Sequence, residues 1–194
     1  MSEPSRIVVG ISGASGAVYG VRLIEVLSAR PDVETHLIMS AGARTTIQYE
    51  LDRDPAEVEA LADVTHAERD LAAAVSSGSF ITAAMVVAPC SMRTLSGVAN
   101  SAADNLIVRA ADVHLKERRP LVLVVRETPL HAGHLRLMSE ATAAGAVILP
   151  PVPGFYQRPQ SVADIVDHTV GKVLDVLGIH DHELFRRWNG LDPA

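Results

Sequence analysis

The sequence has one cysteine, few aromatic residues and no long hydrophobic run. The lone Cys90 excludes a disulfide within the chain. Aromatic residues make up 4% of the 194 residues and hydrophobic residues 48%, so the core must consist mostly of Ala, Val and Leu. No apolar stretch approaches the ~20 residues of a transmembrane helix, and MSEPSR at the N-terminus does not resemble a signal peptide. We therefore expect a cytoplasmic protein that does not enter the membrane.

The chain also lacks an excess of basic residues. Its 17 Lys and Arg face 23 Asp and Glu, a net charge of -6, which argues against binding to a nucleic-acid backbone. The mean hydropathy of +0.20 fits either the two-sided strands of a parallel sheet or apolar faces buried between subunits. The length suits one domain. We expect residues 1–194 to form a single α/β domain with a C-terminal tail from about residue 179.

The most informative stretch is IVVGISGASGAVYG at residues 7–20, where an apolar run ends in small residues. Gly10, Gly13 and Gly16 lie among Ser and Ala, so backbone N–H groups can approach an anion without an intervening side chain. This pattern indicates a phosphate-binding turn and a mononucleotide ligand. A tight turn that binds nothing is the alternative.

Three related motifs do not fit this stretch. A dinucleotide fingerprint requires glycine where Ser12 stands, and an acid after the second strand, which instead ends in Ser40. A P-loop requires a Lys after the glycines, and a nucleophile elbow requires G-x-S-x-G; neither is present.

The hydrophobic pattern predicts five strands that alternate with helices, hence a doubly wound parallel sheet in a Rossmann- or flavodoxin-like three-layer sandwich. The acidic stretch 50–70 is expected to be a solvated excursion, with a lid as the alternative. The predicted strands cover residues 6–11, 33–39, 84–88, 120–125 and 146–149, and the predicted helices cover 17–30, 41–49, 91–100, 102–118, 131–144 and 161–177.

Several charged residues lie where ligands bind in such sheets. Arg126 and Glu127 follow the strand 120–125 directly, at a carboxyl end. Arg109 and Lys116 are seven residues apart on one helix face. Each set has a simpler interpretation, a surface ion pair or solvated cations.

Four segments together resemble the flavin prenyltransferases, the UbiX and phenylacrylic-acid-decarboxylase-associated group. They are GISGASGAVYG at 10–20, PCSMRTLSGVAN at 89–100, ADNLIVRAADVHLKERRPLVLVVRETPL at 103–130 and PPVPGFYQRPQSVADIVDHTVGKVLDVLG at 150–178.

The resemblance implies a homo-oligomer, often a dodecamer, that transfers a dimethylallyl group from dimethylallyl monophosphate to N5 and C6 of reduced FMN. The product, prenylated FMN, is a cofactor of UbiD-type decarboxylases, the implied recipient. The family's flavin contacts fall on Gly13, Ala14, Ser15, Ser40, Ser91, Met92, Arg93, Thr94, Arg109 and Arg126, its prenyl-phosphate contacts fall on Lys116, Arg126, Tyr156 and Lys172, and its acids near the reacting centre fall on Glu50 and Glu127.

The residues themselves agree with a reaction that needs no metal. The chain has no D-D-x-x-D motif to hold Mg²⁺ on a leaving phosphate, so the cations and the Tyr156 hydroxyl would stabilise it. Glu127 would take a proton from the flavin, relayed through Ser15, and return it to the phosphate. Cys90 is expected to be a buried residue beside the flavin.

One departure from the family and the shared fold leave other functions open. Many family members have Arg where this chain has Lys172, which keeps the charge but loses the bidentate fork. A non-catalytic FMN carrier or accessory subunit of a decarboxylase is therefore one alternative. An FMN-dependent cysteine decarboxylase of the same fold is the other.

Overall fold

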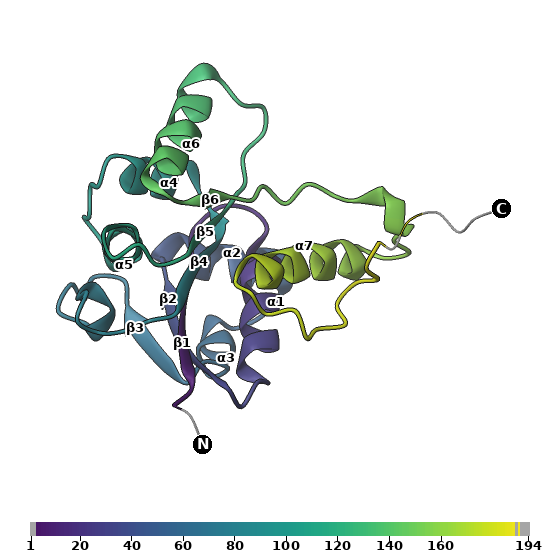
Figure 1. The fold of residues 1–194 in the computed structure, drawn as a ribbon, viewed down its shortest axis with the longest axis horizontal. Helices are drawn as coiled ribbons and strands as arrows, with labels where there is room; N and C mark the ends of the chain where they lie inside the picture. Colours follow the sequence, from purple (N-terminus) through teal and green to yellow (C-terminus); the bar gives the residue numbers. More distant parts are fainter. Residues whose placement is uncertain (1–2, 189, 191–194) are drawn as a thin grey trace.

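A parallel sheet of six strands lies at the centre of the molecule (Figure 1), in the order β3-β2-β1-β4-β5-β6. The computed structural model describes residues 3–188 and 190. The order is that of the doubly wound Rossmann sheet, which confirms the predicted α/β class. The strands are β1 (Ser5–Ile11), β2 (Val33–Met39), β3 (Val64–Ala67), β4 (Ala84–Cys90), β5 (Leu121–Val125) and β6 (Val147–Ile148).

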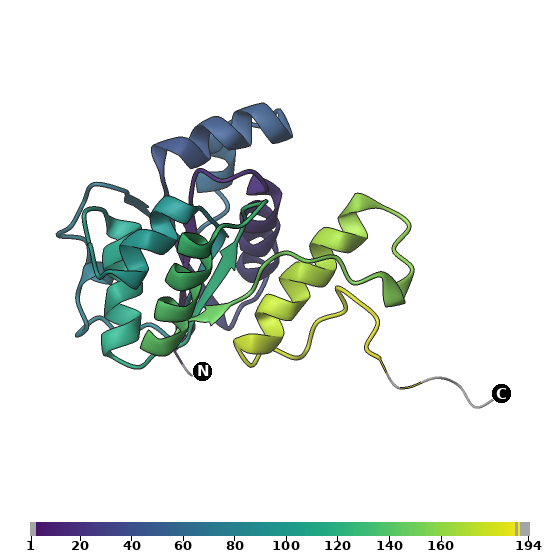
Figure 2. The ribbon, with the colours of Figure 1, turned by 90° about the horizontal axis from the view of Figure 1, so that it is seen from above.

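Helices cover both faces of the sheet (Figures 1 and 2). α1 (Ala17–Ser28) and α7 (Val162–Val176) share a buried cluster with alternate residues of the central strands on one face. α4 (Met92–Ala99), α5 (Leu106–Lys116) and α6 (Ala132–Ala144) cover the other face. The predicted capping box of α7 is present, since Ser161 and Asp164 each bond the other's backbone N–H.

The stretch 50–70 is more regular than predicted. It contains α3 (Pro55–Glu59) and the edge strand β3, after α2 (Ala41–Leu51). β3 has only four residues and alternates between exposed and half-buried positions, so it lacks the apolar run that identifies a central strand. The prediction of five strands was therefore wrong by one.

Two other boundaries differ from the prediction. The helix predicted from residue 102 begins at Leu106, because the Asn105 side chain accepts a hydrogen bond from Val108 N at 3.1 Å and caps the helix there. β4 continues through Pro89 to Cys90, with an irregular register against β5 between Val87 and Cys90.

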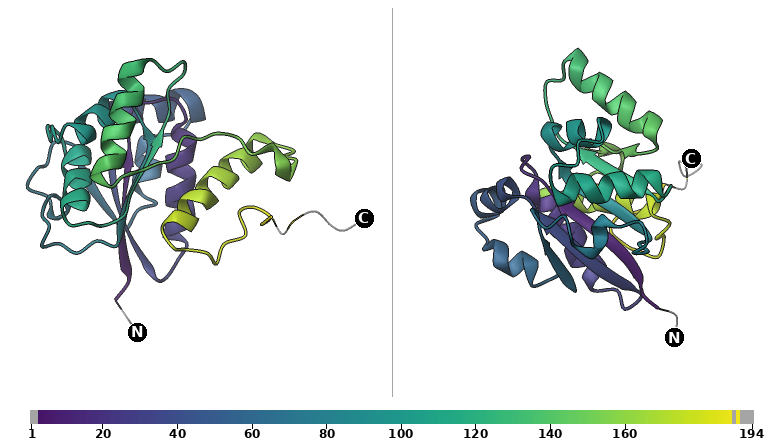
Figure 3. Two further views of the ribbon diagram at one scale, coloured as in Figure 1. Left: turned by 45° about the horizontal axis from the view of Figure 1, so that its top comes forward. Right: turned by 90° about the vertical axis from the view of Figure 1, so that its left-hand side faces the viewer.

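A long connection leaves β6, runs away from the sheet and turns back at its far end into α7 (Figures 2 and 3). We call residues 149–161 the arm; it carries the short 3-10 turn Phe155–Gln157, and η1 (Ala74–Ser76) is the other such turn. Val152 and Phe155 of the arm are each 70% exposed. Within residues 3–188 and 190, no helix combines the length and the apolar character needed to cross a membrane.

Candidate functional site

A cleft of about 670 Å³ lies at the carboxyl ends of β1, β2 and β4. β1 and β4 are neighbours at the point where the strand order reverses, which is the usual ligand site of such sheets. Five of the predicted cofactor residues line the cleft: Gly13, Ser40, Ser91, Arg93 and Thr94.

Other residues of the cleft were not predicted from the sequence. They come chiefly from the segment after β3 and from the turn before α5: Glu68, Arg69, Asn100, Asp104 and Asn105. Glu68 Oε2 accepts a hydrogen bond from Ala41 N at 3.0 Å, and Asp104 pairs with Arg93 at 3.5 Å. Glu68 directly follows β3, a strand that was not predicted, and the turn before α5 carries no glycine, so no signal in the sequence marked these residues.

Ser12 fixes the position of the first turn. Its side chain is buried, and its Oγ donates to Pro89 O at 2.7 Å and accepts from Ser91 N at 2.8 Å. The serine that breaks the dinucleotide fingerprint therefore joins the end of β1 to the end of β4. This role was missed from the sequence, where Ser12 counted only as the absence of glycine.

Two helices begin at the cleft. Ser40 accepts from Ala43 N at 3.0 Å and caps α2, and Ser91 accepts from Thr94 N at 3.3 Å and caps α4. A Cβ on Gly13 would lie 2.9 Å from the Gly42 Cα, so glycine is required for the close approach of the turn to α2. Two helix N-termini, seryl hydroxyls and the Arg93 guanidinium suit the phosphate of a mononucleotide such as FMN.

The N-terminus of α1 is occupied by a carboxylate of the protein itself. Glu50 Oε2 accepts from Gly16 N at 2.9 Å and from Ala17 N at 3.1 Å. Gly16 adopts φ of 96°, a left-handed conformation that favours glycine. The predicted phosphate turn thus holds Glu50 at this helix end.

Ser15, Glu50 and Arg126 come together beside the cleft. Partial burial alone would raise the pKa of Glu50, but hydrogen bonds from the Ser15 side chain and from the Gly16 and Ala17 N–H groups, with the charge of Arg126, lower it. Glu50 is therefore ionised at neutral pH. The geometry places Ser15 against Glu50, a pairing that the sequence did not indicate.

Tyr19 and Glu127 lie at the same edge of the sheet. Burial raises the pKa of Tyr19, and the charge of Arg126 opposes that shift. Arg126 N donates to Cys90 O at 3.1 Å, which holds the residue at the end of β5. Glu127 is exposed, and its Oε1 accepts from Thr128 N at 2.9 Å.

Two predicted site residues lie elsewhere on the same chain. Lys116 ends α5 and pairs with Glu117. β5 then runs from Leu121 to Val125 before reaching Arg126, and five residues of strand span roughly 16 Å. Lys116 is thus at the opposite edge of the sheet from Arg126. Arg109 lies along α5, bonded to Ser76 O at 3.1 Å and Asp112 at 3.0 Å.

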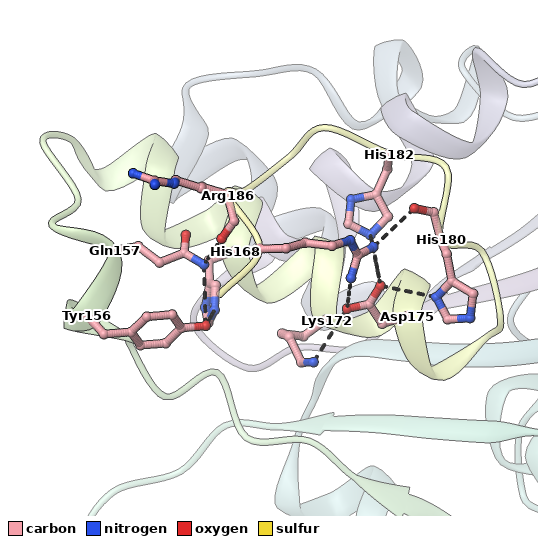
Figure 4. Close-up of polar contacts among 9 residues, drawn as sticks. Tyr156, Gln157, His168, Lys172, Asp175, His180, His182 and Arg186 are labelled. Carbon is pink, nitrogen blue, oxygen red and sulfur yellow. Dashed lines mark hydrogen bonds and ion pairs between the residues drawn. The ribbon is translucent and has the colours of Figure 1, made fainter. Parts of the chain in front are cut away.

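Tyr156 and Lys172 form a third group, on the arm and α7 (Figure 4). Tyr156 is 54% exposed, and its hydroxyl lies 3.3 Å from His168 Nε2. Lys172 Nζ lies 3.4 Å from Asp175 Oδ2. One chain therefore holds the predicted phosphate ligands in three separate places: Arg126, Lys116, and the pair of Tyr156 and Lys172.

The remaining residues considered in the sequence are buried, half-buried or bonded within the tail. Cys90 is fully buried, and burial raises the pKa of its thiol to about 12, so it stays protonated. Ala14 and Met92 are half-buried, and Met92 packs against the core cluster under α4. In the tail, His180 and His182 both bond Asp175, at 3.4 and 3.2 Å.

Comparisons with known proteins agree on one family. A family model described as Flavoprotein matches residues 1–174. The flavin prenyltransferase UbiX of Escherichia coli strain K12 is 61% identical over 186 residues, which cover 95% of this chain and 98% of that protein. That of Thauera aromatica is 56% identical over 185 residues, 95% of this chain and 94% of that protein.

Solved structures give the same result. The crystal structure of AnUbiX (PadA1) in complex with FMN and dimethylallyl pyrophosphate matches with a TM-score of 0.95 and 52% identity, over 98% of this chain and 100% of that one. A dodecameric FMN-dependent UbiX-like decarboxylase from Escherichia coli O157:H7 matches with a TM-score of 0.93 and 50% identity, over 95% and 100%. The FMN-dependent cysteine decarboxylase TvaF shares only the fold, with a TM-score of 0.61 and 18% identity over 74% and 88%.

Proposed function

Because the chain belongs to the UbiX family of flavin prenyltransferases, we propose that it transfers a dimethylallyl group from dimethylallyl monophosphate to N5 and C6 of reduced FMN. FMN is the cofactor of the family. The observation that carries the proposal is the group of Ser15, Glu50 and Arg126 beside a cleft with two helix N-termini. That group places a cation and an ordered carboxylate next to the predicted flavin site.

The cleft residues hold the flavin. The phosphate of the flavin would bind to the Gly13 turn, to Arg93 and to the helix ends capped by Ser40 and Ser91. Arg109 and Arg126 would contact the rest of the flavin. When bound and reduced, FMN supplies the nucleophilic N5 and C6 positions. A helix N-terminus stabilises an anion, and the first N–H of α2, that of Ala41, donates to Glu68 Oε2, a carboxylate that the flavin phosphate would displace.

The cations stabilise the departing phosphate. The C–O bond to the prenyl group breaks as negative charge grows on phosphate oxygen, and donors already in place lower that barrier without reorganisation. Arg126, Lys116 and Lys172 provide the positive charge, and the Tyr156 hydroxyl provides a neutral donor. A site of this kind needs no metal.

The carboxylates act on the proton that C6 of the flavin would lose when its C–C bond to the prenyl group forms. Glu127 is exposed at the end of β5, where it accepts this proton and returns it to the phosphate. Glu50 stays ionised and orients Ser15, whose hydroxyl bonds it. The atoms balance: the C–O bond, the N5–H and C6–H bonds and the π bond of the prenyl group would be lost, and a C–N, a C–C and one new C–H bond would form. Of the two protons released from the flavin, one would go to the prenyl carbon that was part of the double bond and the other would leave with the phosphate.

The complete site requires more than one copy of the chain. β5, which spans roughly 16 Å, separates Lys116 at one edge of the sheet from Arg126 at the other, so we propose that a neighbouring copy supplies one of the two cations to each phosphate. A homo-oligomer meets this requirement, and we propose a dodecamer because the UbiX-like decarboxylase of Escherichia coli O157:H7 is dodecameric. The exposed apolar residues of the arm are suited to contact between copies.

We further propose that a UbiD-type decarboxylase receives the product. The FMN carrier is the competing function, and phosphate release distinguishes the two. The protein is incubated anaerobically with reduced FMN and either dimethylallyl monophosphate or the diphosphate. We expect about one phosphate per flavin with the monophosphate. A carrier would bind FMN and release none.

A further inference from the structure

The Tyr156 hydroxyl has two polar neighbours (Figure 4). Gln157 Nε2 lies 3.3 Å from it, and His168 Nε2 also lies 3.3 Å from it. The Tyr156 and His168 rings meet edge to face, with centroids 5.9 Å apart. Three segments thus converge on one hydroxyl: the arm, α7 and, through Gln157, the tail.

The orientation of the Gln157 amide is determined by the tail. Its Nε2 donates to Arg186 O at 2.8 Å, and a backbone carbonyl can only accept. The atom facing Tyr156 is therefore the amide nitrogen, which donates to the phenolic oxygen. Only the partner at His168 can then decide where the hydroxyl proton points.

The hydrogen bond between Tyr156 and His168 can run in either direction, depending on whether His168 Nε2 carries a proton. If Nε2 carries no proton, it accepts the Tyr156 proton, and Tyr156 has no donor left for a phosphate. If Nε2 carries a proton, it donates to the phenolic oxygen, and the Tyr156 proton is free to point outward. An imidazolium always has the second arrangement, because both of its nitrogens are donors.

We propose that His168 is a positioning residue, whose Nε2–H turns the Tyr156 hydroxyl proton toward the phosphate of the prenyl donor. This inference rests on the proposed function and adds a residue that does not touch the substrate itself. His168 is half-buried and held from both sides, since a Cβ on Gly154 would lie 2.9 Å from its ring and the Phe185 ring lies 5.0 Å away.

The surroundings of the ring set the pH at which it charges. Burial lowers the pKa of His168 below its usual 6.5, and the charge of Lys172 on the same helix lowers it further. On the tail side, His182 and Arg187 face the ring only through Phe185. The wild-type protein should therefore bind the prenyl phosphate better as the pH falls below 6.5.

The test compares four variants: His168→Leu, His168→Gln, Tyr156→Phe and the control His180→Gln. Glutamine keeps a donor at every pH, whereas leucine has none. His180 is also in this region, but its side chain contacts Asp175 and not Tyr156. For each FMN-loaded variant, KM and kcat for dimethylallyl monophosphate are measured from pH 5.5 to 8, and its dissociation constant by calorimetry. The pH profile of each protein is taken relative to that of Tyr156→Phe, which has no hydroxyl for His168 to orient, so that the titration of the phosphate itself cancels.

We expect His168→Leu to raise KM and the dissociation constant about five- to tenfold, with kcat within about twofold. His168→Gln should restore binding and abolish the pH dependence. An unchanged KM in His168→Leu, alongside a raised KM in Tyr156→Phe, would refute the role of His168 alone. Unchanged values in both variants, or no binding by the wild type, would refute the prenyl-phosphate site together with it.

Discussion

Replacement of Ser12 by alanine tests whether one side chain holds the two halves of the site together. The Ser12 Oγ makes two hydrogen bonds, at 2.7 Å to Pro89 O and 2.8 Å from Ser91 N, and the residue is 1% exposed. Pro89 O keeps a second partner, since Ser12 N also donates to it at 3.2 Å. The N–H of Ser91 has only the Ser12 oxygen as its partner within the described residues.

The expected loss of stability in Ser12→Ala comes from the Ser91 N–H, which loses its acceptor, and not from Pro89 O, which keeps a partner. A half-buried N–H left without an acceptor costs about 1–3 kcal/mol, so we expect the free energy of unfolding to fall by about 2 kcal/mol. For a chain of this length the Tm should fall by roughly 4–8 °C. Ser91 caps α4 in the cleft, so the affinity for FMN should fall as well.

The assay is urea unfolding of the FMN-free protein, followed by titration with FMN. Ser28→Ala is the matched control, because that Oγ makes one local bond, to Glu25 O at 3.3 Å. Ser12→Gly should be less stable still, since glycine increases the entropy of the unfolded chain. If Ser12→Ala unfolds within about 0.5 kcal/mol of Ser28→Ala, the bridge between β1 and β4 does not stabilise the cleft.

Three further predictions concern the charged residues. Glu50→Gln should lower the free energy of unfolding by about 1 kcal/mol at neutral pH. Because the pKa of Glu50 is lowered in the folded state, that difference should vanish as the pH falls through its folded pKa; a difference independent of pH would contradict the helix-end role. Glu127→Gln should bind FMN normally yet release phosphate at least about 100-fold more slowly, and full activity would refute its assignment as the base. Lys172→Arg should lower KM for the prenyl phosphate a few-fold, because arginine can make a bidentate contact. An unchanged KM would mean that residue 172 does not contact the phosphate.

The subunit arrangement can be tested by mixing two inactive variants. Lys116→Ala and Arg126→Ala each remove one cation from every site of a homo-oligomer. If two copies share each site, co-expression of the two variants should restore some sites with both cations. Recovery of activity would support sharing, whereas mixtures no more active than the single variants would place both residues in the same copy.

Periodicity predicted the central part of the fold because buried parallel strands are continuous apolar runs. β1, β2, β4 and β5 are of this kind, with residues such as Val9, Leu37 and Val86 fully buried. β3 is an edge strand with one half-exposed face, and its composition does not differ from that of a loop. Side-chain caps determine where these helices begin. The cap at Ser161 was recognised in the sequence, so the start of α7 was predicted; the cap at Asn105 was not, so α5 was predicted to begin too early.

The site was predictable to the extent that it lies at strand ends. Ser40, Ser91 and Arg126 follow strands directly, and their positions could be read from the sequence. Glu68 also follows a strand directly, but β3 itself was not predicted, and Tyr19 reaches the site through a tertiary contact with Arg126, which no local pattern encodes. The contact between His168 and Tyr156 crosses from helix to arm, and it too became visible only in the structure.

The mass of the flavin after turnover tests the central claim most directly. The protein is incubated without oxygen with reduced FMN and dimethylallyl monophosphate, denatured, and the extracted flavin is weighed by mass spectrometry. We predict a gain of one dimethylallyl unit in the wild type, and none in Glu127→Gln under the same conditions. Flavin of unchanged mass from a wild-type protein that has bound FMN would contradict the proposed transfer and identify the chain as a flavin carrier.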